Sequence, residues 1–327
     1  MSFLSRLRPD NFTLALASTV ILASVLPASG TFAEILEKVT SGVIVMLFFL
    51  HGSKLSRDAI WAGIGHWRLH LVVTLTTFAF FPLLGWLLQP LLKSVLPQEL
   101  VLGVLFLCTL PATVQSAIAL TAVARGNIPA AVCSASGSTL MGIVFTPLLV
   151  GLLLSHTATE NTNPLDAVIK ISVQLLLPFA LGHFLRPWTQ SWLQRLGNRL
   201  KVVDQGSILL VVYAAFSGAV VAGLWQQMPW TAMLSLFVIC ALLLSCSMLW
   251  CVWISRRLGF SIADEATILF CGAQKSLVSG IPMAKVLFTA AAVGPMVLPV
   301  MLFHPMQLMV SAVIAGRYGR KEANPPI

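Results

Sequence analysis

Long apolar stretches alternate with short polar connections along almost the whole chain. A helix needs about 20 mostly apolar residues to cross a bilayer, and ten stretches reach or approach that length. The predicted spans cover residues 11–28, 38–52, 67–92, 99–124, 127–154, 164–185, 203–224, 229–254, 263–288 and 291–315. The pattern therefore predicts an all-α polytopic membrane protein with ten transmembrane helices.

The fourth and ninth predicted spans are interrupted by polar and helix-breaking residues. The fourth contains Pro111-Ala-Thr-Val-Gln115-Ser116, and the ninth contains Gly272-Ala-Gln274-Lys275-Ser276. Gln274 lies 159 positions after Gln115. Matching breaks in two halves of a chain are typical of transporters built from internal repeats, which bind their solute at the breaks. We therefore expect helices four and nine to be broken and to cross.

A second pair of matching motifs supports an internal repeat. Pro305 lies 158 positions after Pro147, nearly the offset that relates the two breaks. Five spans per half is an odd number, which inverts the second half relative to the first. We predict two inverted five-helix repeats, residues 1–156 and 157–327, joined at the polar stretch 156–163.

Composition supports the membrane class, and the basic residues give the orientation. The 327-residue chain is 57% hydrophobic and 9% charged, far less charged than a soluble protein. With the N-terminus inside, fifteen of the 20 Lys and Arg residues fall in cytoplasmic segments, as the positive-inside rule requires. We predict an inner or plasma membrane protein with both termini cytoplasmic. The net charge of +9 then faces membrane lipid, and we expect no nucleic-acid partner.

Lys275 lies near the middle of the ninth span. A charge at that depth costs about 2.5–3.5 kcal/mol on insertion scales, so it requires a cavity or a partner. The acidic residues lie in loops or near span ends, and Asp204 is the nearest of them to a span centre. Lys275 could bind an anionic substrate, or backbone carbonyls and Gln115 could hold it in a structural role.

The remaining candidates are polar residues at or near the breaks. The predicted substrate-binding residues are Gln115, Ser116, Gln274, Lys275, Ser276 and His304. His304 could also serve a proton relay, or be a hydrogen-bonded core histidine. Ser134 and Ser138 share one helical face and, with Gln274, could bind a cation through oxygen ligands. The alternative for the serines is close packing of two helices through small residues.

Catalytic motifs are not found. The sequence has no Gly-x-Ser-x-Gly elbow, no His-Glu-x-x-His pattern and no P-loop. A dyad of Ser138 and His304 is the weaker alternative. We predict no enzyme activity and no organic cofactor, with sodium as the candidate bound ion.

At these motifs the chain resembles the bile acid:sodium symporter superfamily, in particular its divergent branch related to solute carrier family 10 member 7 and bacterial counterparts. The resemblance covers essentially the whole chain and is most specific at residues 109–118, 270–277 and 304–307. It implies a core of spans 3–5 and 8–10 that moves against a panel of spans 1, 2, 6 and 7. It also implies coupling to sodium.

Three positions that the resemblance assigns to sodium binding differ here. Phe270 stands where the bile-acid branch has an acidic residue, and Lys275 where that branch has an amide. Ser116-Ala117 replaces a Ser-Asn pair. These differences weaken the expectation of two-sodium coupling and of a bile-acid substrate. We hypothesise that the Lys275 ammonium occupies the place of a sodium ion, with coupling to protons as the alternative to sodium.

The sequence thus predicts a secondary active transporter, a symporter of a small organic anion or amphipathic solute. It leaves the oligomeric state open. Two alternatives stand beside this prediction. One is a passive anion channel or facilitator on the same scaffold, and the other is a non-transporting regulator of membrane ion handling.

Overall fold

The computed structural model describes residues 11–54, 64–154, 175–227 and 229–323, and the regular structure in these ranges is helical throughout. The first half contains α1 (Asn11–Val25), α2 (Gly30–Lys54), η2 (Ile64–His66), α4 (Trp67–Leu75), η3 (Thr76–Phe80), α5 (Phe81–Val95), α6 (Gln98–Thr109), α7 (Gln115–Val123) and α8 (Ile128–Leu154). The second half contains Leu175–Phe184, α10 (Arg186–Leu196), α11 (Asn198–Val221), α12 (Leu224–Gln227), α13 (Trp230–Arg257), α14 (Ile262–Gly272), α15 (Leu277–Leu287) and α16 (Ala290–Ala323). The predicted link at 156–163 and the start of the sixth span lie outside the described residues.

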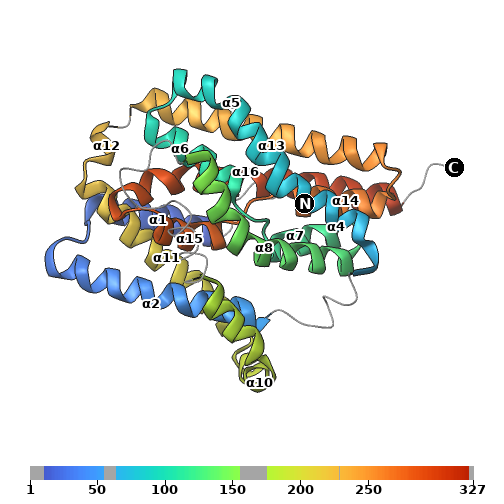
Figure 1. Cartoon of the computed structure of the whole chain (residues 1–327), viewed down its shortest axis with the longest axis horizontal. Helices are drawn as coiled ribbons and strands as arrows, with labels where there is room; N and C mark the ends of the chain where they lie inside the picture. Colours follow the sequence, from blue (N-terminus) through green and yellow to red (C-terminus); the bar gives the residue numbers. More distant parts are fainter. Residues whose placement is uncertain (1–10, 55–63, 155–174, 228, 324–327) are drawn as a thin grey trace.

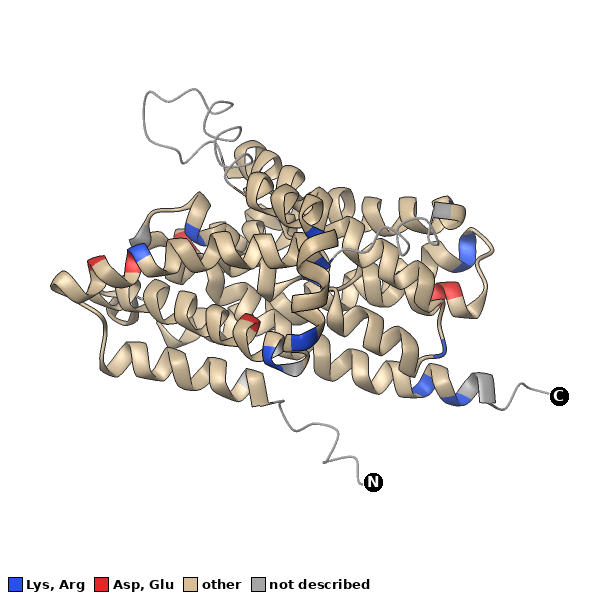
Figure 2. Ribbon diagram, turned by 90° about the horizontal axis from the view of Figure 1, so that it is seen from below, with Lys and Arg blue, Asp and Glu red and all other residues tan. Residues whose placement is uncertain are grey.

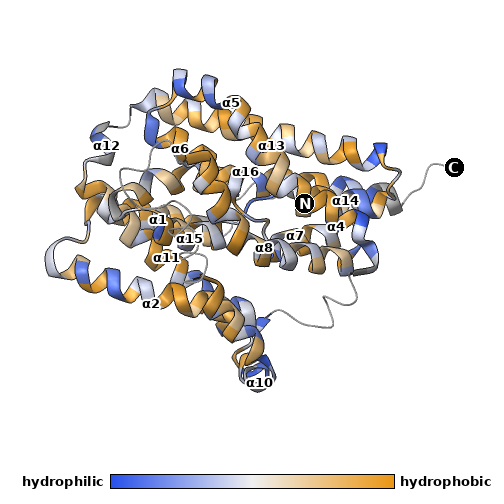
Figure 3. Ribbon diagram, viewed as in Figure 1, coloured by the Kyte–Doolittle hydropathy of each residue, from blue (hydrophilic) through white to orange (hydrophobic). Residues whose placement is uncertain are grey.

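Several helices are long and apolar enough to cross a membrane. Among the described residues, five meet that description: Trp67–Val95, Ile128–Leu154, Val202–Val221, Trp230–Arg257 and Ala292–Arg320. Leu14–Val25, Gln98–Thr109 and Leu175–Phe184 are shorter apolar helices. Figure 3 shows how continuous the hydrophobic colouring is along the helices, and Figure 2 how sparse the charged residues are. Large apolar side chains are exposed on the outside, including Trp230 (84%) and Leu152 (71%), as expected of a surface that faces lipid.

The helices fall into two groups that meet in the middle of the molecule. In Figure 1, α5 and α13 lie along one edge, while α1, α2 and α11 lie together toward the other, and both groups have direct contacts within them. Helices α15 and α16 lie between, and α11 packs against both. A ten-span inverted repeat remains a prediction, but the order long helix, broken helix, long helix occurs in both halves.

Both predicted breaks are present. Helix α6 ends at Thr109 because Leu110 precedes a proline, and such a residue avoids the helical region; its ψ is 150°. The chain becomes helical again at Gln115. Helix α14 ends at Gly272, and α15 begins after Ser276, whose hydroxyl caps the new helix by accepting from the Ser279 N–H.

The third predicted span is one continuous helical rod that contains a π-helical turn. The turn, η3, connects α4 to α5, and Pro82 is the second residue of α5. Proline provides no N–H, so one carbonyl of the preceding turn loses its helical partner. This local irregularity contributes to the site described next.

Candidate functional site

The two helix breaks lie against each other. Residues 110–114 separate α6 from α7, and residues 273–276 separate α14 from α15. The Ser276 N–H donates to the Pro111 carbonyl oxygen at 2.9 Å. Unwound backbone at membrane depth has no water to bond, so it must be satisfied within the protein. The second break thus supplies a hydrogen-bond donor to the first, and the first supplies an acceptor to the second.

Gln274 connects the breaks through its side chain. It is fully buried, and its Oε1 accepts from Thr113 Oγ1 at 2.7 Å and from Ser116 Oγ at 3.1 Å. Its Nε2 donates to Ser311 Oγ at 3.2 Å. One amide therefore joins the first break, the second break and α16.

Gln307 on α16 holds the backbone of the second break. Its Oε1 accepts from the Lys275 N–H at 2.8 Å, and its Nε2 donates to the Lys275 carbonyl at 2.9 Å. The same Nε2 lies 3.0 Å from His304 Nδ1. The side-chain amide replaces the backbone partners that Lys275 would have in a continuous helix.

The Lys275 side chain ends on three backbone carbonyls. Nζ donates to the oxygens of Thr77 (2.9 Å), Cys108 (3.1 Å) and Leu110 (2.7 Å). It also lies 4.1 Å from the ring centroid of Phe81, a cation–π contact. The side chain is fully buried, and an ammonium has three donors, so each donor has an acceptor.

The sequence explains why the Thr77 carbonyl is available. In the π turn the Phe81 N–H bonds to the Thr76 carbonyl. The next residue, Pro82, has no N–H to offer to Thr77. Lys275 supplies the missing donor.

The carbonyls at the end of α6 are available for a similar reason. In a continuous helix the Ala112 N–H would bond to the Cys108 carbonyl, but it donates to Ser138 Oγ at 3.0 Å instead. Leu110 lies beyond the last turn of the helix. A positive charge at this position also faces the negative end of the α6 dipole.

The serine face of α8 binds groups of the protein. Besides the bond from Ala112 to Ser138, Ser134 Oγ lies 2.6 Å from His70 Nδ1 on α4. Thr146 Oγ1, further along α8, donates to the Thr109 carbonyl at 2.8 Å. Ion binding by Ser134, Ser138 and Gln274 stays a prediction.

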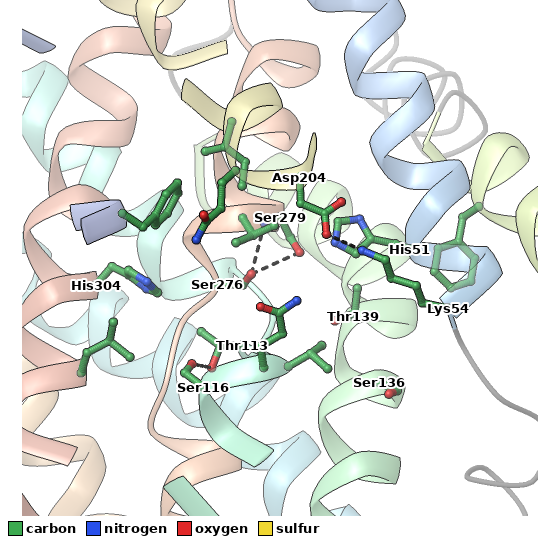
Figure 4. Close-up of a pocket in the computed structure, with 18 residues that line it drawn as sticks. His51, Lys54, Thr113, Ser116, Ser136, Thr139, Asp204, Ser276, Ser279 and His304 are labelled. Atoms are coloured by element: carbon green, nitrogen blue, oxygen red, sulfur yellow. Dashed lines mark hydrogen bonds and ion pairs between the residues drawn. The ribbon is translucent and has the colours of Figure 1, made fainter. Parts of the chain in front are cut away.

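A cavity of about 330 Å³ lies beside the crossing (Figure 4). The residues from the side of the breaks include Thr113, Gln115, Ser116, Ser276, Ser279 and His304. The opposite wall includes Phe12, His51, Lys54, Phe179, Asp204, Gln205 and Ile208, from α1, α2, Leu175–Phe184 and α11. The cavity therefore lies between the broken helices and the group of α1, α2 and α11.

Comparison with known proteins decides the class. A model of the SBF-like CPA transporter family matches residues 10–320. The chain belongs to this family. It is 59% identical over 316 residues to the uncharacterized protein PA2026 of Pseudomonas aeruginosa, covering 97% of this chain and 95% of that one. It is 52% identical over 312 residues to the Escherichia coli protein named "Putative symporter YfeH", covering 95% and 93%. It is 29% identical over 320 residues to the rat sodium/bile acid cotransporter 7, covering 96% and 94%.

Family membership confirms the predicted resemblance and makes this a membrane transporter of the bile acid:sodium symporter type. The breaks and the cavity are then the places to look for a transport site. Phe270, at the position that the resemblance gives to an acidic residue, is fully buried in α14.

Four of the six residues predicted to bind substrate line the cavity: Gln115, Ser116, Ser276 and His304. Gln274 lies behind the wall, where it positions Thr113 and Ser116. Lys275 takes the carbonyl-held alternative and turns its charge away from the cavity, toward α6 and η3. In this structure the Lys275 ammonium therefore does not face the cavity.

The sequence analysis missed the charged groups of the opposite wall. Lys54 Nζ and Asp204 Oδ2 form an ion pair between α2 and α11, with His51 beside them (Figure 4). The available signal was that Lys54 and Asp204 are opposite charges at span ends predicted to lie on the same side of the membrane.

Proposed function

We propose that the protein is a secondary active transporter that carries a small organic anion or amphipathic solute by alternating access. The single observation behind this proposal is the cavity, which is lined by residues of both breaks and by residues of α1, α2 and α11. A site between two groups of helices can be opened to either side by rocking one group against the other.

The chemistry of the cavity favours a solute with an apolar body and a polar or anionic end. Its volume of 330 Å³ falls at the small end of the range for organic ligands. Phe12, Phe179 and Ile208 offer apolar contact, Thr113 and Ser116 offer hydroxyl groups, and Lys54 offers a positive charge.

The proposal includes ten spans in two inverted repeats, with both termini cytoplasmic in an inner or plasma membrane. With that orientation, Lys54 and Asp204 are at the cytoplasmic ends of α2 and α11, and the part of the cavity that they line lies on the cytoplasmic side. Toward the other end of α2, Glu37 lies 3.5 Å from Lys285 of α15, an ion pair that connects α2 to the second broken helix.

Coupling to sodium or to protons completes the proposal. Three carbonyl oxygens within 3.1 Å of Lys275 Nζ are an arrangement that a bound cation would also receive. This supports the hypothesis that the ammonium stands in for one coupling ion. A second ion or a proton would then have to bind elsewhere.

Uptake into proteoliposomes tests the site. The probes are radiolabelled taurocholate and a panel of smaller carboxylates and sulfonates. We expect uptake of at least one probe by the wild type and its loss in Gln205→Trp, which fills the cavity without touching the hydrogen bonds of the breaks. Val202→Trp is the matched control, since Val202 lies on the same helix and is 69% exposed. Equal uptake by Gln205→Trp and the control would place the solute elsewhere.

A further inference from the structure

The ion pair of Lys54 and Asp204 forms a charged corner in the cavity wall. Asp204 is 7% exposed and binds Lys54 through Oδ2 alone. Its other oxygen, Oδ1, is buried and has no hydrogen-bond partner among the described residues. A buried carboxylate oxygen without a hydrogen-bond donor costs free energy. A proton that binds to Oδ1 would remove this cost.

Few other groups at the cavity can titrate. Of the described residues that line it, the ionisable ones are His51, Lys54, Asp204 and His304. His51 lies one helical turn before Lys54 on α2 and interacts electrostatically with both members of the pair. His304 comes from α16 on the other wall and already lies 3.0 Å from Gln307 Nε2. The lining residues of α1 and α15, Phe12, Val278 and Ser279, do not titrate in this range.

We propose that Asp204 is the proton acceptor of the transport cycle and that Lys54 binds the anion which is carried with that proton. The inference rests on the proposed function, since it names the coupling site of the same cavity. It assigns a role to two residues outside the breaks.

Charge balance explains the coupling. The intact pair is neutral, so an anion that approaches Lys54 has to displace the Asp204 carboxylate and leave a negative charge buried. A proton on Asp204 releases Lys54, and the cavity then carries one positive charge. An anion neutralises that charge. The proton and a monovalent anion thus bind as a neutral pair, and either one raises the affinity for the other by the same factor.

The first experiment requires no substrate. Infrared difference spectra of the full-length protein are recorded as the pH is lowered, and the band of a protonated carboxylic acid is followed. We expect one component of the wild-type band to be missing in Asp204→Asn and retained in Glu37→Gln. Glu37 is the control because it is also an acidic residue in an ion pair, here with Lys285. It lies on α2, the helix of Lys54, and does not line the cavity. An identical band in Asp204→Asn, or no carboxylic acid band in the wild type, would overturn the proposal.

The second experiment measures uptake into sodium-free proteoliposomes with the same anion panel. In the wild type, the half-saturating anion concentration should fall by up to about tenfold for each unit by which the pH is lowered, because one proton is bound with each anion. Asp204→Asn should take up the anion without this pH dependence and without accumulation under a proton gradient. Lys54→Met should weaken uptake at every pH.

The outcomes separate the two claims. If the wild type takes up no anion in the panel, the proposed function fails, while the infrared result still decides whether Asp204 takes up a proton. If the wild type and Asp204→Asn both accumulate anion under a proton gradient, the coupling role of Asp204 is wrong. The same assay is repeated with a sodium gradient. Accumulation that occurs only with sodium, and that Asp204→Asn loses, would also overturn the proposal, since the carboxylate would then bind a metal cation.

Discussion

Replacing Lys275 with methionine removes a buried ammonium that binds three carbonyl groups. Methionine has a similar length and fills the space with apolar atoms, so packing around Phe81 is largely kept. The carbonyls of Thr77, Cys108 and Leu110 lose the donor that Nζ gives each of them.

The expected loss of stability follows from these three groups. Each buried carbonyl without a donor costs about 1–3 kcal/mol. Removal of the ammonium also removes the cost of burying a charge, which offsets part of this. Three carbonyls at this cost amount to about 3–9 kcal/mol, and after the offset we expect a net loss toward the lower end, about 3–5 kcal/mol. In a chain of this length that corresponds to a melting temperature lower by about 4–7 °C.

Thermal unfolding of the purified protein in detergent measures this effect, with the nine tryptophans as the fluorescent signal. Lys285→Met is the matched control. Lys285 lies in the last turn of α15, its side chain is 7% exposed, and it forms an ion pair with Glu37, whose side chain is 60% exposed. Because solvent screens the Glu37 side of this pair, its contribution is about 1 kcal/mol, well below that of three buried hydrogen bonds. Equal melting temperatures for Lys275→Met and Lys285→Met would refute the carbonyl-binding role of Lys275.

Two further substitutions test the packing and the second break. Gly52→Ala would place a Cβ 1.9 Å from the Phe179 carbonyl oxygen, so we expect it to separate α2 from Leu175–Phe184 and to reduce the amount of folded protein in the membrane. Gly42→Ala on the same helix meets nothing within 4 Å and should be neutral. Fluorescence size-exclusion chromatography of both variants measures this difference. Gln307→Leu leaves the backbone N–H and carbonyl of Lys275 without their side-chain partners. We expect it to lower the free energy of unfolding by about 2–4 kcal/mol and so to lower the melting temperature. An unchanged melting temperature would contradict the pairing.

The broken helices were predictable from local sequence. Pro111 disfavours helix at the residue before it, and Gly272 ends α14, so the positions of both interruptions follow from backbone chemistry alone. The mutual contact of the breaks was predicted from the repeat of polar residues. The π turn was not predicted, although Pro82 is a local signal for a missing donor at this place.

The orientation of side chains at the site required the three-dimensional structure. Sequence places Lys275 at mid-membrane but does not say whether its flexible side chain turns toward the cavity or toward the end of α6. Three backbone carbonyls decide the matter, and all three belong to segments more than 160 residues away from Lys275 in the sequence. The same holds for Lys54 and Asp204, which lie 150 residues apart and meet only because α2 packs on α11.

The most direct test of a coupled transporter is whether solute accumulates. Proteoliposomes with the wild-type protein are given an anion from the panel at equal concentration inside and outside, and then a sodium gradient or a proton gradient is imposed in separate experiments. We predict that one of the two gradients drives the internal concentration above the external one, and that this accumulation collapses when an ionophore dissipates the gradient. Equal concentrations under both gradients, with rapid exchange of label, would contradict coupled transport and identify a passive pathway.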